Sequence, residues 1–139
     1  MPLVHFLLLQ FLAHVLADYF FQTSAMAYQK NKLGFKSRLL PLHILIVFVC
    51  SWLLSFQIEF FVGAGIISIL HYIIDGFKAK ASAHKSFWKY AFFVDQFLHI
   101  IVLVVVSWVF SEYHGVAPLW EIPFSTTQIA IAIAYLCCL

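Results

Sequence analysis

Every aspartate in the chain stands four positions from a histidine. The three pairs are His14 with Asp18, His71 with Asp75, and Asp95 with His99. On an α-helix, side chains four positions apart project from the same face, so both members of a pair can act on one ligand. With seven histidines in 139 residues, an aspartate gains such a partner by chance about one time in ten. Three pairs from three aspartates therefore indicate selection or a structural need.

Neutral imidazole and carboxylate groups are ligands for divalent ions such as Zn, Mn or Fe. We expect a divalent-metal site whose ligands are His14, Asp18, His43, His71, Asp75, Asp95 and His99. Seven ligands exceed one tetrahedral site. They fit two ions that share a bridging carboxylate, or one ion with outer Asp–His hydrogen bonds that orient the imidazoles. The plainer alternative is that each pair is a buried hydrogen bond that fastens two helices together.

The composition indicates what kind of elements must position these residues. Hydrophobic residues make up 64% of the chain and charged residues only 10%, with a mean hydropathy of +0.97. A soluble domain is about 45–50% apolar and about 25% charged. We therefore expect an all-α fold, an integral membrane helical bundle formed by residues 1–139 as one domain, with the lipid bilayer as its partner. This composition excludes intrinsic disorder, a coiled coil and a free nucleic-acid-binding domain.

Apolar stretches divide the chain into about five transmembrane helices. A span needs roughly 20 apolar residues. The expected spans are residues 3–22, 40–57, 60–77, 91–111 and 125–139. The last is short at 15 residues, so whether it crosses fully stays open.

Charged residues predict the orientation of these spans. All basic residues fall in two short stretches, with Lys30, Lys32, Lys36 and Arg38 in the first and Lys78, Lys80, Lys85 and Lys89 in the second. The glutamates Glu59, Glu112 and Glu121 lie between other spans. Because basic loops stay in the cytoplasm, we expect the N-terminus outside and both basic stretches inside.

With this topology the polar residues inside the spans share one depth. At about 1.5 Å of rise per residue, four of them lie roughly 3–6 Å from the cytoplasmic span ends: Asp18, His43, Asp75 and Asp95. The other three, His14, His71 and His99, lie about one turn deeper. An aspartate at the centre of a membrane helix costs about 2.5–3.5 kcal/mol, so we expect these groups to face one another inside the bundle.

Three further residues are weaker candidates for contact with a substrate. Lys78 follows Asp75 by three positions and is placed to bind a phosphate, although a lysine that extends to the interface is the more common case. Gln22 lies one turn beyond Asp18, and Gln96 follows Asp95 directly. Amides at such positions more often cap a helix or contact solvent.

Four segments carry a resemblance to a known family. HVLADYFFQ, LHILI, LHYIIDGFKAK and VDQFLH occur in this order and resemble domain-of-unknown-function family 3307, over roughly residues 5–110 and without the last span. The resemblance implies a small multi-pass protein of the bacterial inner (cytoplasmic) membrane, and no particular reaction. A fainter likeness to membrane-bound metal-dependent hydrolases rests only on His and Asp in helical spans and serves as analogy.

Two classes of function follow from these residues. One is a metal-dependent hydrolase that opens to the cytoplasmic interface, with Asp95 or Asp75 as bridging ligand or general base and basic residues that attract a phosphoester or lipid head group. The other binds or transports divalent cations or protons without a reaction, and the small chain would then form a homo-oligomer. A structural protein with Asp–His fastenings remains the third alternative. Few polar residues lie in the outer half of the spans, which favours a one-sided site.

Overall fold

The computed structural model describes residues 3–82, 88–115 and 124–138. Within these ranges all regular structure is helical, which confirms the all-α prediction. The elements are α1 (Leu3–Val15), the π-helix η1 (Leu16–Phe20), α2 (Ser24–Leu33), the 3₁₀ turn η2 (Gly34–Lys36), α3 (Leu40–Ser55), the 3₁₀ turn η3 (Ile58–Phe60), α4 (Phe61–Ser82), α5 (Trp88–His114) and α6 (Thr126–Cys137). The side chains of Lys85, Lys89 and Glu121, part of the orientation argument, lie outside the described residues.

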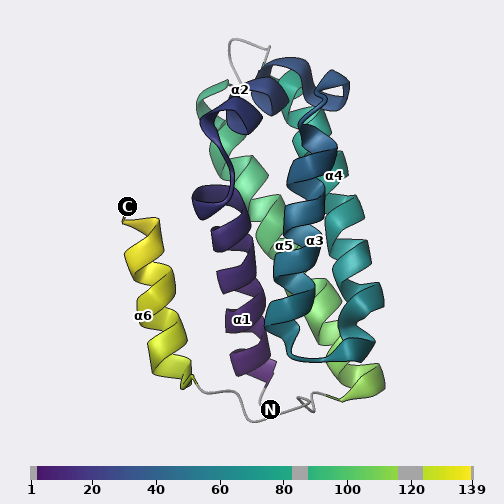
Figure 1. The fold of residues 1–139 in the computed structure, drawn as a ribbon, viewed down its shortest axis with the longest axis vertical. Helices are drawn as coiled ribbons and strands as arrows, with labels where there is room; N and C mark the ends of the chain where they lie inside the picture. The colour runs from purple at the N-terminus through teal and green to yellow at the C-terminus, as the bar shows by residue number, and fades with distance from the viewer. Residues whose placement is uncertain (1–2, 83–87, 116–123, 139) are drawn as a thin grey trace.

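Four helices run side by side and two others cover them. Figure 1 shows α1, α3, α4 and α5 as a bundle, with α6 against α1 and α2 across one end. The opposite end of the bundle is closed by aromatic side chains. The ring of Phe6 lies 5.0 Å from that of Phe60 and 5.8 Å from that of Phe110, measured between centroids. One end of the core is thus apolar, and the polar residues gather toward the end that α2 covers.

The described helices support fewer membrane spans than the sequence predicts. Three are long and apolar enough to cross a membrane by length and composition: Leu3–Phe20, Ile58–Ala81 and Tyr90–His114. The segment Ser24–Lys36 makes a bend of 111° with α3, and this pair counts as a fourth span only if it is one broken span. With 12 residues, α6 rises only about 18 Å. The fifth span and the outside N-terminus therefore stay predictions.

A close contact between glycines holds α2 and η2 against α4. Gly34 has a φ of 53°, and a Cβ there would lie 2.5 Å from the carbonyl oxygen of Gly76. A Cβ on Gly76 would lie 2.1 Å from the ring of Phe35, which packs directly over it. Both glycines are needed because any side chain would separate the two elements. The crossing places one face of α2 above the polar end of α4.

Candidate metal centre

The structure brings all seven predicted metal ligands together in the bundle interior. None is more than 7% exposed: His14, Asp18, His43, His71, Asp75, Asp95 and His99. They come from α1, η1, α3, α4 and α5. The ring of His71 lies at the centre, with its centroid 4.1 Å from that of His99 and 5.2 Å from that of His43. The expectation that these groups face one another is met, whereas their role as metal ligands remains to be tested.

Four atoms at the centre have the spacing of metal ligands. The Nε2 atoms of His43 and His71 lie 3.1 Å apart. Asp18 Oδ1 lies 3.3 Å from His43 Nε2 and 3.4 Å from His71 Nε2, and Asp75 Oδ2 lies 3.4 Å and 3.3 Å from the same two atoms. Ligand atoms bound about 2.0–2.1 Å from a tetrahedral zinc lie about 3.3 Å from each other. Either carboxylate with the two imidazoles therefore fits three corners of a coordination sphere.

The π-helix η1 accounts for the position of Asp18. Its wide turn is closed by a hydrogen bond from the amide of Phe21 to the carbonyl of Leu16, 2.8 Å long. A π-turn holds one more residue than an α-turn and so changes the direction of the side chains it carries. The Oδ2 atom of Asp18 accordingly lies 4.0 Å from Nε2 of His14, the partner that the sequence spacing predicts. It lies closer to His43 and His71 on two other helices.

His99 and Asp95 form a second group beside the first. His99 Nδ1 donates a hydrogen bond of 2.7 Å to the carbonyl oxygen of Asp95. With Nδ1 protonated, Nε2 of the neutral ring carries the lone pair, which is the usual arrangement of a metal-binding histidine. That Nε2 lies 3.9 Å from Asp75 Oδ1. Asp75 thus faces the central group with one oxygen and His99 with the other.

Three overlapping triads have ligand atoms within 4.8 Å of one another. They are His14–Asp18–His71, His43–His71–Asp75 and Asp75–Asp95–His99. The first two triads share His71 and the last two share Asp75. This pattern fits one ion with outer hydrogen bonds, and it equally fits two ions bridged by Asp75.

Lys30 is a member of the site that the sequence analysis treated only as a loop cation. It is 4% exposed, and its Nζ lies 2.9 Å from Asp75 Oδ2. Lys30 and Met26, four positions apart, are the two buried residues of α2. A spacing of four positions indicates that one face of the helix is buried, but it does not predict that the Lys30 ammonium contacts Asp75.

The three weaker candidates all contact cluster residues. Lys78 Nζ lies 2.7 Å from Asp95 Oδ2, and Gln96 Nε2 donates a hydrogen bond of 3.1 Å to the same oxygen. Gln22 Nε2 donates a hydrogen bond to the main-chain carbonyl of Asp18 at 2.9 Å, so it acts as a backbone cap. Contact with a substrate stays a prediction for all three.

The cluster carries an unbalanced charge and contains buried polar atoms without hydrogen-bond partners among the described residues. Its three carboxylates face two ammonium groups, Lys30 and Lys78, so neutral histidines leave one net negative charge. Several buried atoms have no hydrogen-bond partner among the described residues, namely His14 Nε2, Asp18 Oδ1, His43 Nδ1, Asp75 Oδ1, Asp95 Oδ1 and His99 Nε2. Buried polar atoms are nearly always paired with protein, water or an ion. The net negative charge therefore calls for a proton or a cation, and the unpaired atoms call for hydrogen-bond partners or an ion.

Comparison with known proteins identifies the family. A family model described as "Protein of unknown function (DUF3307)" matches residues 6–131. The chain belongs to this family. The DUF3307 match confirms the resemblance and extends it beyond residue 110 into α6, which the sequence analysis had left outside. No curated protein and no solved structure matches the chain. The site's own chemistry must therefore indicate the function.

Proposed function

We propose that this DUF3307 protein is a metal-dependent hydrolase of the bacterial inner membrane that acts on a phosphoester or lipid head group. One divalent ion is held by His43, His71 and the carboxylates of Asp18 and Asp75. The proposal rests on one observation: two buried imidazole nitrogens lie 3.1 Å apart, and one oxygen of each of the two carboxylates lies 3.3–3.4 Å from both nitrogens.

The net charge of the cluster supports a cation together with an anionic substrate. One net negative charge remains after Lys30 and Lys78 are counted. A divalent ion reverses that sign, and one anionic substrate group then restores neutrality. Buried charges are costly unless they are compensated. A phosphodiester carries one negative charge and a phosphomonoester about 1.5 to 2, so a phosphoester supplies at least the required charge.

The residues around the ion have separate roles in this proposal. A bound divalent ion with an open position activates water and polarises a phosphoryl oxygen. Asp75 is a ligand because both of its oxygens face histidines. Asp95 is the general base because it is the aspartate of the cluster that this proposal does not use as a ligand, and its Oδ1 has no hydrogen-bond partner in the described part of the chain. Lys78, 2.7 Å from Asp95, binds the anionic group.

Replacement of the proposed base tests the reaction. We expect Asp95→Asn to retain the metal but to lower phosphoesterase activity by about 10²–10⁴-fold, the usual contribution of a general base. Glu112→Gln, an exposed acid on the same helix, is the matched control and should keep full activity. The assay is phosphate release from phosphoester substrates by purified protein in vesicles. Equal activity in Asp95→Asn and wild type would remove Asp95 from the mechanism.

Two ion pairs favour an alternative in which the cluster has a purely structural role. Lys30 neutralises Asp75, and Lys78 neutralises Asp95. In this alternative the remaining negative charge is met by a proton on one histidine, and the cluster fastens the helices together. Transport is less well supported, because the buried outer pair Gln10 and Ser51 satisfies itself through hydrogen bonds of 2.6 and 3.1 Å. Metal content separates the structural alternative from the hydrolase.

A further inference from the structure

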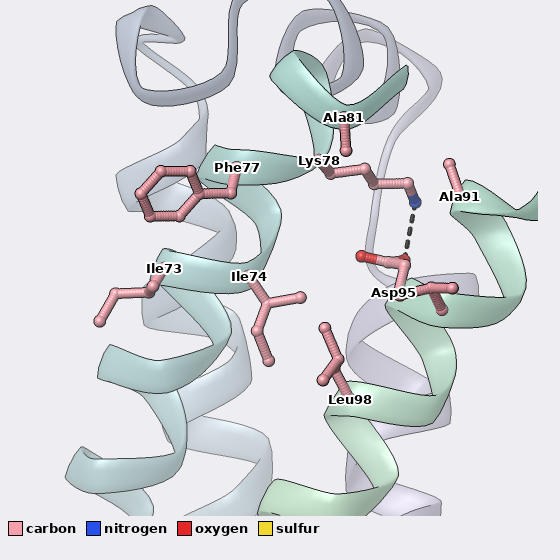
Figure 2. A pocket seen from close by; sticks show the side chains of 9 residues that line it. Ile73, Ile74, Phe77, Lys78, Ala81, Ala91, Asp95 and Leu98 are labelled. Atoms are coloured by element: carbon pink, nitrogen blue, oxygen red, sulfur yellow. Dashed lines mark hydrogen bonds and ion pairs between the residues drawn. The ribbon is translucent and has the colours of Figure 1, made fainter. Parts of the chain in front are cut away.

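An apolar groove leads from the lipid-facing surface of α4 and α5 to the edge of the metal cluster. Its volume is about 240 Å³. Its lining includes Ile73, Ile74 and Phe77 of α4 and Leu98 of α5, and Figure 2 shows Lys78 and Asp95 joined across the groove between the two helices. Among the described residues that line it, Lys78 and Asp95 are the only charged ones, and Asp95 is also a member of the cluster. The groove therefore connects the outside of the bundle with the proposed general base.

The side chains that line the groove differ in size on the two sides of the Lys78–Asp95 pair. On one side of the Lys78–Asp95 pair the lining is small, with Ala81 and Ala91. On the other side it consists of large apolar side chains, of which Phe77 is 53% exposed and Leu98 42% exposed. A molecule that fits this lining has a compact polar head at the Lys78–Asp95 pair and an apolar tail against the large side chains. Sites that enclose a whole drug-sized ligand hold about 300–1,000 Å³, so this groove accepts one chain segment.

Charge favours an anionic head. Lys78 points into the groove with 15% of its side chain exposed. Exposed cations on the same end of the bundle, among them Lys36, Arg38 and Lys80, have no acidic residue in their sequence stretches. Basic residues at a membrane surface attract anionic lipids. The exposed apolar wall meets the acyl chains in which such a lipid already lies.

We propose that this groove binds an anionic phospholipid, with its acyl chain against Ile73, Ile74 and Leu98 and its phosphate on Lys78. This inference rests on the proposed function and names the substrate class of that site. The phosphate on Lys78 is then next to Asp95, since the two side chains are 2.7 Å apart. A lipid thus enters sideways from the bilayer and presents its phosphoester to the base and to the ion.

Native mass spectrometry of the full chain in detergent, with three probes, tests the proposal. The probes are phosphatidate, diacylglycerol with the same acyl chains, and inorganic phosphate. We expect phosphatidate to bind about tenfold more tightly than diacylglycerol, the gain that one charged hydrogen bond gives. Inorganic phosphate should compete only weakly. If it competes as well as phosphatidate does, the site binds phosphate and not a lipid. If the two lipids bind equally, recognition of the anionic head by Lys78 is excluded.

Two variants locate the binding. Lys78→Met should remove most of the preference for phosphatidate, whereas Lys32→Met, an exposed lysine on α2, should keep it. Leu98→Trp fills the groove and leaves both residues of the ion pair in place. It should weaken the binding of both lipids. Its control is Ile101→Trp, because Ile101 is equally exposed at 42% but lies outside the groove lining. Loss of lipid in both tryptophan variants would contradict a defined groove.

Metal content measured on the same samples distinguishes this inference from the proposed function. Bound metal without a phosphatidate preference overturns the lipid groove and leaves the metal site. A phosphatidate preference that Lys78→Met and Leu98→Trp remove, in a protein without metal, overturns the hydrolase and leaves the groove as a lipid-binding site.

Discussion

Lys30 is the residue at which the metal account and the structural account differ most. Its ammonium lies 2.9 Å from Asp75 Oδ2, an oxygen that the proposed ion also uses. Since two cations compete for that oxygen, we expect Lys30→Met to bind divalent metal more tightly, by about tenfold or 1.4 kcal/mol. The measurement is a metal titration of the purified variant against wild type.

A matched variant separates this effect from a general change in charge. Lys32 is on the same helix but is exposed, and its ammonium contacts Tyr28, donating a hydrogen bond of 2.9 Å to the hydroxyl. Lys32→Met should leave metal affinity unchanged. In the structural account the Lys30→Met variant binds no metal. Its free energy of unfolding falls by about 3–5 kcal/mol, because Asp75 is left buried without its partner. That combination would count against the metal centre.

Sequence spacing identified the members of the cluster but not their partners. His14 and Asp18 are four positions apart, yet Asp18 lies nearer to His43 and His71 than to His14. Helical periodicity reports which side chains share a face, and it cannot report which other helices that face meets. The contact of Lys30 with Asp75, 45 positions away, is hidden for the same reason.

At the scale of elements, the crossing of η2 over α4 sets the position of Lys30. We expect Gly76→Ala to displace Phe35, because the new Cβ would lie 2.1 Å from its ring. Overpacking of this kind costs about 1–3 kcal/mol, which thermal unfolding in detergent measures. The double variant Gly76→Ala with Phe35→Ala should recover part of the loss, since the two changes act on one contact.

Gly65 on the same helix is the control for that experiment. A Cβ on Gly65 meets no atom within 4 Å, so Gly65→Ala should be neutral or stabilising through its better helix propensity. Equal destabilisation by both alanines would show that the Gly76 contact with Phe35 does not matter.

The helices themselves were more predictable than their ends and turns. The apolar stretches predicted spans at 60–77 and 91–111, where the structure has the longer helices α4 and α5. The π-turn at Leu16–Phe20 left no mark in composition, and the basic stretch before α3 indicated a break between two spans but not its bend of 111°. Both depend on contacts with other helices, which a hydropathy pattern does not contain.

At the scale of the whole molecule, the orientation in the membrane can be tested directly. In a background without the native cysteines, a membrane-impermeant maleimide added to cells should label Ile58→Cys but not Lys36→Cys. Both positions are exposed, and basic segments remain in the cytoplasm. The reverse pattern would move the cluster to the outer face and remove the argument for a substrate on the cytoplasmic side.

Metal content tests the central claim most directly. His71 belongs to two of the three triads, so its loss should empty the site, whereas His114 is exposed at the end of α5. After reloading with zinc or manganese and removal of excess metal, elemental analysis should find about one ion per chain in wild type and in His114→Ala. In His71→Ala it should find almost none, because each missing ligand weakens the site strongly. A wild-type protein that is folded and monodisperse but holds no metal after reloading would contradict the account, and the cluster would then be a structural one.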